Sequence, residues 1–206
     1  MSPFPWFDLG VLAALILLNG VFAMSELAIV SARTAQLRMA ANRGSRGARL
    51  AVQLAAEPGK FLSTVQIGIT LIGIVAGAYS GATLGGPVGE RMTALGLPAD
   101  MAEDAGFVVV IGLTTYFSLV VGELVPKQLA LRAAVPIAKL MAPPMVLLAK
   151  VAAPFVWLLD TSSGLLMRLL GIRHKGESAL TAEELQMIFA VATYLGVIGE
   201  QERTFL

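Results

Sequence analysis

The chain has 206 residues, of which 56% are hydrophobic and only 14% are charged, and its mean hydropathy is +0.77. Soluble domains typically carry about 25% charged residues, so this composition predicts an integral membrane protein. The net charge of +1 gives no reason to expect a nucleic-acid partner, and the absence of cysteine excludes disulfides and thiolate metal sites.

The first apolar segment runs from Leu9 to about Val30. It is long enough to cross a hydrocarbon core about 30 Å thick. A cleaved signal peptide is the alternative, but the leader MSPFPWFD holds an acid and no base, which is the opposite of a signal peptide's basic start. We therefore expect a transmembrane helix here.

Two further spans are predicted, at Phe61–Ala82 and Ala105–Val121. The link at 31–60 is strongly basic, with Glu57 as its one acid, whereas the link between the second and third spans is mostly acidic. By the positive-inside rule the basic link is cytoplasmic and the N-terminus lies outside. Residues 1–135 are thus predicted to form a core of three transmembrane helices. The bases of the first link are Arg33, Arg38, Arg43, Arg46, Arg49 and Lys60.

The segment 136–175 is predicted to lie at the membrane surface rather than to cross it. Its apolar part, Val135–Leu159, contains four prolines and two lysines, and proline breaks helices. We expect two short helices that meet near Pro143–Pro144 and lie half-sunk in the inner leaflet. A fourth span is the alternative. His174 is expected to be a surface residue, because no partner for a histidine metal site is evident.

The remaining residues, 176–206, have a different pattern. The sequence from Thr181 to Glu184 is a capping box, and apolar residues follow it at helical spacing. This pattern predicts an amphipathic cytosolic helix with an uncovered apolar face. It suggests a longer parent protein that continues into a further domain.

Polar residues recur within the spans at helical spacing. In the first span Asn19 and Glu26 share a face, with Ser25 one step around. In the second, Ser63, Gln66, Thr70 and Gly73 form one stripe, and the third offers Ser118 before Glu123. Each has an ordinary alternative: hydroxyls can bond to the carbonyl one turn back, Gln66 can bridge helices, and Glu26 can pair with Arg33. Gly68, Gly73 and Gly77 are expected to allow close approach of another backbone.

The sequence LVVGELVPK ends the third span with an unusual carboxylate, Glu123. Pro126 cannot donate a hydrogen bond to the carbonyl of Gly122, four residues back, which predicts a free carbonyl beside the acid. Acids in membrane segments commonly mark ion paths. Because the nearby groups are all oxygen donors, a hard cation such as Mg²⁺ is favoured over zinc or copper. Lys127 is expected to reach lipid phosphates.

Three ordered motifs resemble the transmembrane domain of the CorC/CNNM magnesium transporters. They are FAMSELAIV from Phe22, PGKFLSTVQIGIT from Pro58, and GELVPK from Gly122. The resemblance implies three membrane helices per subunit, a proline-broken juxtamembrane pair, a homodimer, and cytosolic CBS modules that bind ATP in the full-length protein. It places the chain in the cell (plasma) membrane, in contact with lipid, as a transporter and not an enzyme.

The same resemblance implies Mg²⁺ export coupled to Na⁺ entry through an alternating-access core. It places the ion at Ser25, at polar residues of the second helix, and at Gly122 and Glu123. The second helix departs from the family pattern, with Ile69 and Gly73 where asparagines are common. This leaves the oxygens to Ser63, Gln66 and Thr70. Asn19, Glu26 and Ser118 are assigned to an ion pathway.

Three other functions are weighed against transport. The chain could be a regulatory or structural membrane anchor for a cytosolic nucleotide-binding module, in which the polar stripe only joins helices. A haemolysin is disfavoured because no long amphipathic pore-lining stretch is present. An intramembrane hydrolase is disfavoured because no nucleophile–base pair accompanies Glu26 and Glu123.

Overall fold

The computed structural model describes residues 3–170, which form helices joined by short connections. The chain divides into two units, Met1–Leu158 and Leu159–Leu206, and the features below lie in the first unless stated. Within residues 3–170, four stretches are long and apolar enough to span a membrane, which confirms the prediction of an all-α membrane protein. The helices are α1 (Trp6–Ser31), α2 (Thr34–Asn42), α3 (Arg46–Ala56), α4 (Pro58–Ala94), α5 (Ala99–Leu119), η1 (Val120–Leu124), α6 (Val125–Arg132) and α7 (Ala134–Leu169).

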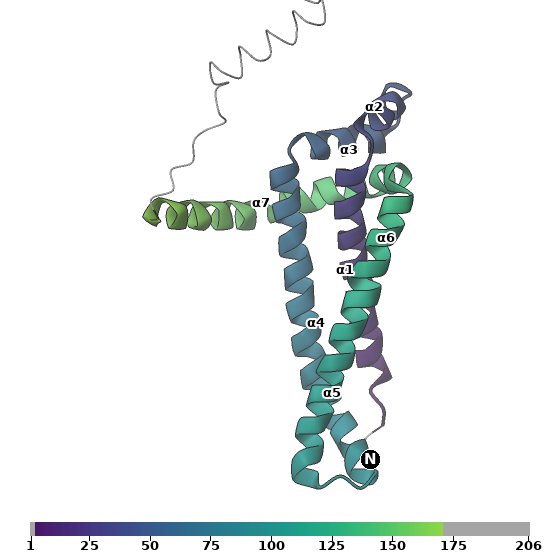
Figure 1. Ribbon diagram of the computed structural model, residues 1–206, viewed down its shortest axis with the longest axis vertical. Helices are drawn as coiled ribbons and strands as arrows, with labels where there is room; N and C mark the ends of the chain where they lie inside the picture. Colours follow the sequence, from purple (N-terminus) through teal and green to yellow (C-terminus); the bar gives the residue numbers. More distant parts are fainter. Residues whose placement is uncertain (1–2, 171–206) are drawn as a thin grey trace, which may run out of the picture. The chain divides into compact units, whose positions relative to one another are not determined.

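The long helices form a bundle in which α4 packs on both α1 and α5 (Figure 1). All three predicted spans lie within it, although α4 extends twelve residues past the predicted end at Ala82. The extension is helical because Pro87 interrupts the chain's hydrogen bonding at one point only, and packing against α5 holds the turns on both sides.

Glycines bring α4 and α5 together, but not the ones that the sequence predicted. A methyl group added at Gly106 would lie 2.6 Å from the nitrogen of Gly89 and 2.8 Å from the carbonyl oxygen of Gly85, so only glycine fits at this crossing. A methyl group at Gly73 or Gly77 would have nothing within 4 Å among the described residues. Within residues 3–170 no atom approaches those two positions, whereas a methyl group at Gly68 would lie 2.6 Å from the Phe22 ring of α1, so the close approach expected at Gly68 is made by a side chain and not by a backbone.

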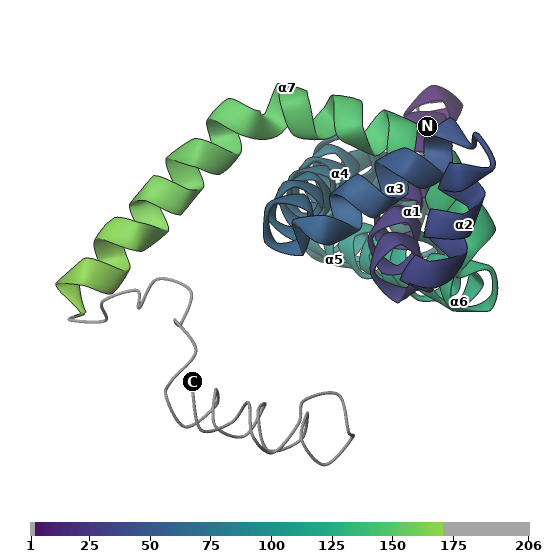
Figure 2. The same cartoon turned by 90° about the horizontal axis from the view of Figure 1, so that it is seen from above.

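The basic link at 31–60 is itself helical, which the sequence analysis missed. It folds as α2 and α3, and the Ser45 hydroxyl caps α3 by accepting a hydrogen bond from the nitrogen of Ala48 at 3.3 Å. Leu37, Ala48 and Ala51 are fully buried in a cluster with the neighbouring ends of α1 and α4. The link is thus a packed cap on one end of the bundle (Figure 2).

The connection from α3 to α4 carries an exposed ion pair. The ammonium of Lys60 donates to the carboxylate of Glu57 at 2.7 Å, and this bond holds the pKa of Glu57 below its ordinary value of 4.5. Pro58 follows at the start of α4, where a missing backbone N–H costs nothing. The pair and the proline together fix where the second long helix begins.

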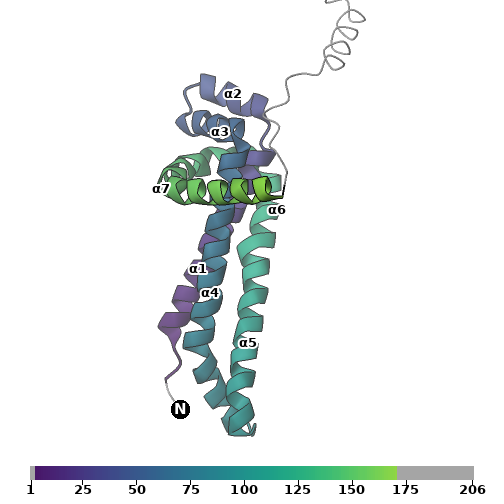
Figure 3. The same cartoon turned by 90° about the vertical axis from the view of Figure 1, so that its left-hand side faces the viewer.

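The expectation of two short helices meeting near Pro143–Pro144 is wrong, because α7 is one continuous helix. Its early turns are held by burial: Ala138, Ala142 and Met145 join the same cluster as α2 and α3, so the missing proline donors do not separate the turns. Up to residue 158, α7 crosses the ends of α1 and α4 instead of running beside them (Figure 3). The predicted helix within 176–206, and His174, lie outside the described residues.

Candidate functional site

A π-helical turn, η1, lies where the third long helix approaches Pro126. The nitrogen of Val125 donates to the carbonyl of Val120, five residues back, which puts one extra residue into the turn. Pro126 explains the change, because it has no N–H for the carbonyl of Gly122. The helix is therefore widened at this point and continues as α6, beyond Val121, where the third span was predicted to end.

The first helix packs directly against this widened turn. A methyl group added at Gly122 would lie 3.1 Å from the carbonyl oxygen of Ile16, and one at Gly20 would lie 3.0 Å from Cγ of Pro126. The two glycines thus let the backbones of α1 and η1 meet. This contact brings the polar residue Asn19 beside the main chain of the turn.

Asn19 joins the two helices by a buried hydrogen bond. Its amide Nδ2 donates to the carbonyl oxygen of Gly122 at 3.2 Å, and the side chain is only 8% exposed. Its other atom, Oδ1, is buried and has no hydrogen-bond partner within residues 3–170. Buried oxygens without a donor are costly, so this atom is suited to accept a bond from a water molecule or to ligate a cation.

Ser25, two turns further along α1, is fully buried. Its hydroxyl donates to the carbonyl of Val21 at 2.6 Å, as the ordinary alternative for membrane serines expects. A hydroxyl that donates its one hydrogen bond still has two lone pairs on its oxygen. The bond therefore leaves Ser25 able to ligate a cation and orients its oxygen.

Glu123 forms an ion pair that the sequence analysis did not predict. The ammonium of Lys127 donates to its carboxylate at 2.6 Å, and the two side chains are about one-third exposed, 35% for Lys127 and 36% for Glu123. The expectation that Lys127 reaches lipid phosphates is therefore wrong for this structure. The spacing of four residues on a helix could have revealed the pair.

The polar stripe of α4 is not brought to the π-turn. Gln66 and Thr70 are exposed and Ser63 is half-buried, and η1 packs on α1, α5 and α6. Glu26 and Ser118, assigned to a pathway, are both half-buried. Of the predicted residues, the structure joins Asn19 to Gly122 and leaves the α4 oxygens apart from them.

The polar groups in this region are oxygen donors. No group of three or more His, Cys, Asp or Glu side chains gathers within residues 3–170. The oxygen donors are the Glu123 carboxylate, the Ser25 hydroxyl, the Asn19 amide oxygen and the carbonyl of Gly122, which Pro126 leaves without a helical donor and to which Asn19 donates. Mg²⁺ accepts such sets because it takes one or two carboxylates and keeps waters. Of these donors, the structure joins Asn19 to the Gly122 carbonyl, while the Glu123 carboxylate is paired with Lys127.

Known proteins are similar in sequence to this chain. Residues 10–202 match the family described as the cyclin M transmembrane N-terminal domain, CNNM. The UPF0053 protein sll0260 of Synechocystis is 45% identical over 95% of this chain and 44% of its own length. The UPF0053 protein YhdT of Bacillus subtilis is 32% identical over 95% and 43%, and the UPF0053 inner membrane protein YfjD of Escherichia coli is 32% identical over 83% and 37%. The chain thus spans less than half the length of these relatives.

Proposed function

Because the chain belongs to the CNNM family of cyclin M transmembrane domains, we propose that it transports Mg²⁺ across the membrane. The observation that carries the proposal is the buried hydrogen bond from Asn19 to the Gly122 carbonyl. It leaves the other amide atom of Asn19, Oδ1, buried and without a donor within residues 3–170. In soluble proteins such an oxygen is usually satisfied. In an ion path it is kept open for a passing cation.

In the proposed site Glu123 neutralises the ion, while Ser25 and the Gly122 carbonyl supply neutral oxygens. Lys127 pairs with the Glu123 carboxylate when no metal is bound, because the lysine ammonium and Mg²⁺ are both cations and compete for the same carboxylate oxygens. Ser63, Gln66 and Thr70 take part in a second conformation, in which α4 has moved toward the π-turn. This requirement for movement fits alternating access.

Direction and coupling are proposed here because the three motifs resemble those of the CorC/CNNM transporters. We propose Mg²⁺ export driven by Na⁺ entry, carried out by a homodimer, with no enzymatic step. The name of the Escherichia coli relative, an inner membrane protein, supports the cell membrane as the location. The basic cap of α2 and α3 would face the cytoplasm and the N-terminus would lie outside. The longer relatives leave room for the ATP-binding CBS modules, which would follow on the cytoplasmic side.

The test is Mg²⁺ flux in liposomes containing the purified chain. Glu123→Gln removes the charge and keeps the shape, so we expect flux to fall to background while the dimer still forms. Glu103→Gln is the matched control, because Glu103 is exposed at the start of α5 and away from the π-turn, and it should transport normally. Flux through Glu123→Gln equal to that of the unaltered chain would rule out the proposed role. A sodium gradient should accelerate flux only in the active chains.

A regulatory membrane anchor is the second candidate, and the ion pair between Glu123 and Lys127 favours it, since the pair already neutralises the acid. Isothermal titration separates the two functions. A transporter should give saturable Mg²⁺ heat that Ser25→Ala weakens, whereas an anchor should give none.

A further inference from the structure

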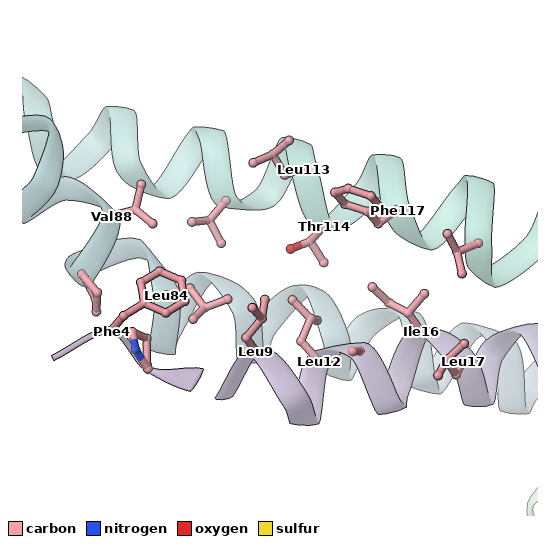
Figure 4. A pocket seen from close by; sticks show the side chains of 15 residues that line it. Phe4, Leu9, Leu12, Ile16, Leu17, Leu84, Val88, Leu113, Thr114 and Phe117 are labelled. Carbon is pink, nitrogen blue, oxygen red and sulfur yellow. The ribbon is translucent and has the colours of Figure 1, made fainter. Parts of the chain in front are cut away.

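An apolar cavity of about 420 Å³ lies between α1 and α5 and is floored by α4, at the end of the bundle nearest the N-terminus (Figure 4). Side chains from α1, including Leu9, Leu12 and Ile16, face Leu113 and Phe117 of α5 across it. The cavity exists because α1 and α5 each pack closely on α4 and scarcely touch one another here.

The cavity is a groove that opens on the side of the bundle, as the exposed fractions of its lining residues show. Its inner side chains are buried: Leu12 of α1, Leu84 of α4 and Val110 of α5 are each 5–6% exposed. Its rim is not, since Leu17 is 60% and Leu113 54% exposed. Both rim residues lie within stretches that are long and apolar enough to span a membrane, so in a bilayer the opening would face the hydrocarbon core.

Water is a poor occupant of this groove. Fourteen of its fifteen lining residues are apolar, and Thr114 is the exception. Cavities lined in this way stay dry and bind apolar molecules instead. The volume falls within the range of about 300–1,000 Å³ that is usual for small-molecule sites. A hydrocarbon chain from the surrounding lipid therefore matches both the lining and the opening.

A cationic side chain stands where the lipid's polar part would lie. Arg91 donates from Nη1 to the carbonyl of Pro87 at 2.6 Å, and its guanidinium lies 5.0 Å from the centre of the Phe4 ring. Both Pro87 and Phe4 line the groove. A guanidinium has five N–H donors and binds phosphate well, so it can serve more than one acceptor.

We propose that this groove binds one phospholipid, with an acyl chain between α1 and α5 and its phosphate at Arg91. The site is separate from the π-turn and does not depend on the proposed Mg²⁺ transport. Its occupant would fill the space between α1 and α5 that the protein leaves empty.

Retention of phosphatidylethanolamine by the purified 206-residue chain, measured by native mass spectrometry, tests the acyl part of the site. Ala13→Trp places a large ring in the groove and should lower retention about tenfold. Ala14→Trp is the matched control, because Ala14 is the next residue, is equally exposed and does not line the groove. Equal retention by the two variants would overturn the proposal.

The phosphate contact is tested with Arg91→Gln. Loss of a charge-assisted hydrogen bond should weaken phosphatidylethanolamine retention roughly tenfold. Retention of diacylglycerol, which has the chains and no phosphate, should be unchanged. Arg91→Lys should restore part of the phospholipid binding. If Arg91→Gln reduced both lipids equally, or neither, the assignment of Arg91 would be wrong.

Discussion

Gly122 stands with its α-carbon against the main chain of α1, where any side chain would have to enter occupied space. A β-carbon there would lie 3.1 Å from the carbonyl oxygen of Ile16 and 3.3 Å from the amide of Asn19. The glycine is therefore a packing requirement, and it also sets the position of the carbonyl that Asn19 binds. The packing of α1 on the π-turn and the hydrogen bond from Asn19 therefore both depend on Gly122.

Gly122→Ala is predicted to destabilise the protein by about 1–3 kcal/mol, because a packed interface must shift to admit the methyl group. It should also reduce Mg²⁺ flux, since the shift moves Asn19. Thermal unfolding in detergent measures the first effect and liposome flux the second. Gly112→Ala is the control: Gly112 is exposed on α5 with nothing within 4 Å, so alanine should be neutral or slightly stabilising there. Similar melting temperatures for both variants would contradict the packing argument.

Lys127 is predicted to compete with Mg²⁺ for Glu123. Lys127→Met removes the competitor, so Mg²⁺ should bind about 1.4- to fivefold more tightly, in line with the roughly 0.2–1 kcal/mol of a partly exposed ion pair. Isothermal titration measures the change in affinity. Lys127→Arg keeps the positive charge and should leave affinity close to that of the unaltered chain. Weaker Mg²⁺ binding by Lys127→Met would show that the lysine supports the site and does not compete for it.

At the level of helices, the π-turn is the element on which the site depends. The extra residue in this turn rotates the residues that follow it about the helix axis, relative to α5. Pro126 packs on Gly20 of the first helix. A regular α-helix through the same residues would shift Glu123 around the helix relative to Asn19.

Pro126→Ala is predicted to separate stability from function. The alanine restores an N–H that can bond to the Gly122 carbonyl, which favours an ordinary α-helix and competes with Asn19 for the same oxygen. We expect equal or greater thermal stability with markedly reduced Mg²⁺ flux. The control is Pro98→Ala, which alters a proline before α5 and should not change flux. Normal flux in Pro126→Ala would mean that the widened turn is not needed.

Sequence patterns predicted the three long helices because apolar length and terminal charge depend on local composition. They also singled out Asn19 and Gly122, which the structure joins by a hydrogen bond. They could not predict the π-turn: a proline shows that a carbonyl is freed, but packing decides whether the helix breaks or widens. They missed α2 and α3 because those helices are stabilised by burial of Leu37, Ala48 and Ala51 against distant segments. The exposure of Gln66 and Thr70 also depends on helix rotation, which only tertiary contacts fix.

Across the whole molecule, charge is divided between the two ends of the bundle. The end formed by α2 and α3 is basic, and the connection between α4 and α5 is flanked by Glu90, Asp100 and Glu103. The division predicts which end faces the cytoplasm. It does not settle the path of α7, which is long enough to span but crosses the bundle's basic end in its first part.

Single cysteines test this topology, since the chain has none of its own. In intact cells, a membrane-impermeant maleimide should label Leu95→Cys, because Leu95 is 83% exposed in the acidic connection. Met39→Cys, on α2 and 55% exposed, should be labelled only after the membrane is opened. Leu169→Cys, at the end of α7 and 76% exposed, distinguishes the two paths. If α7 stays at the inner surface, as we predict, Leu169→Cys behaves like Met39→Cys; if α7 crosses the bilayer, it is labelled from outside like Leu95→Cys.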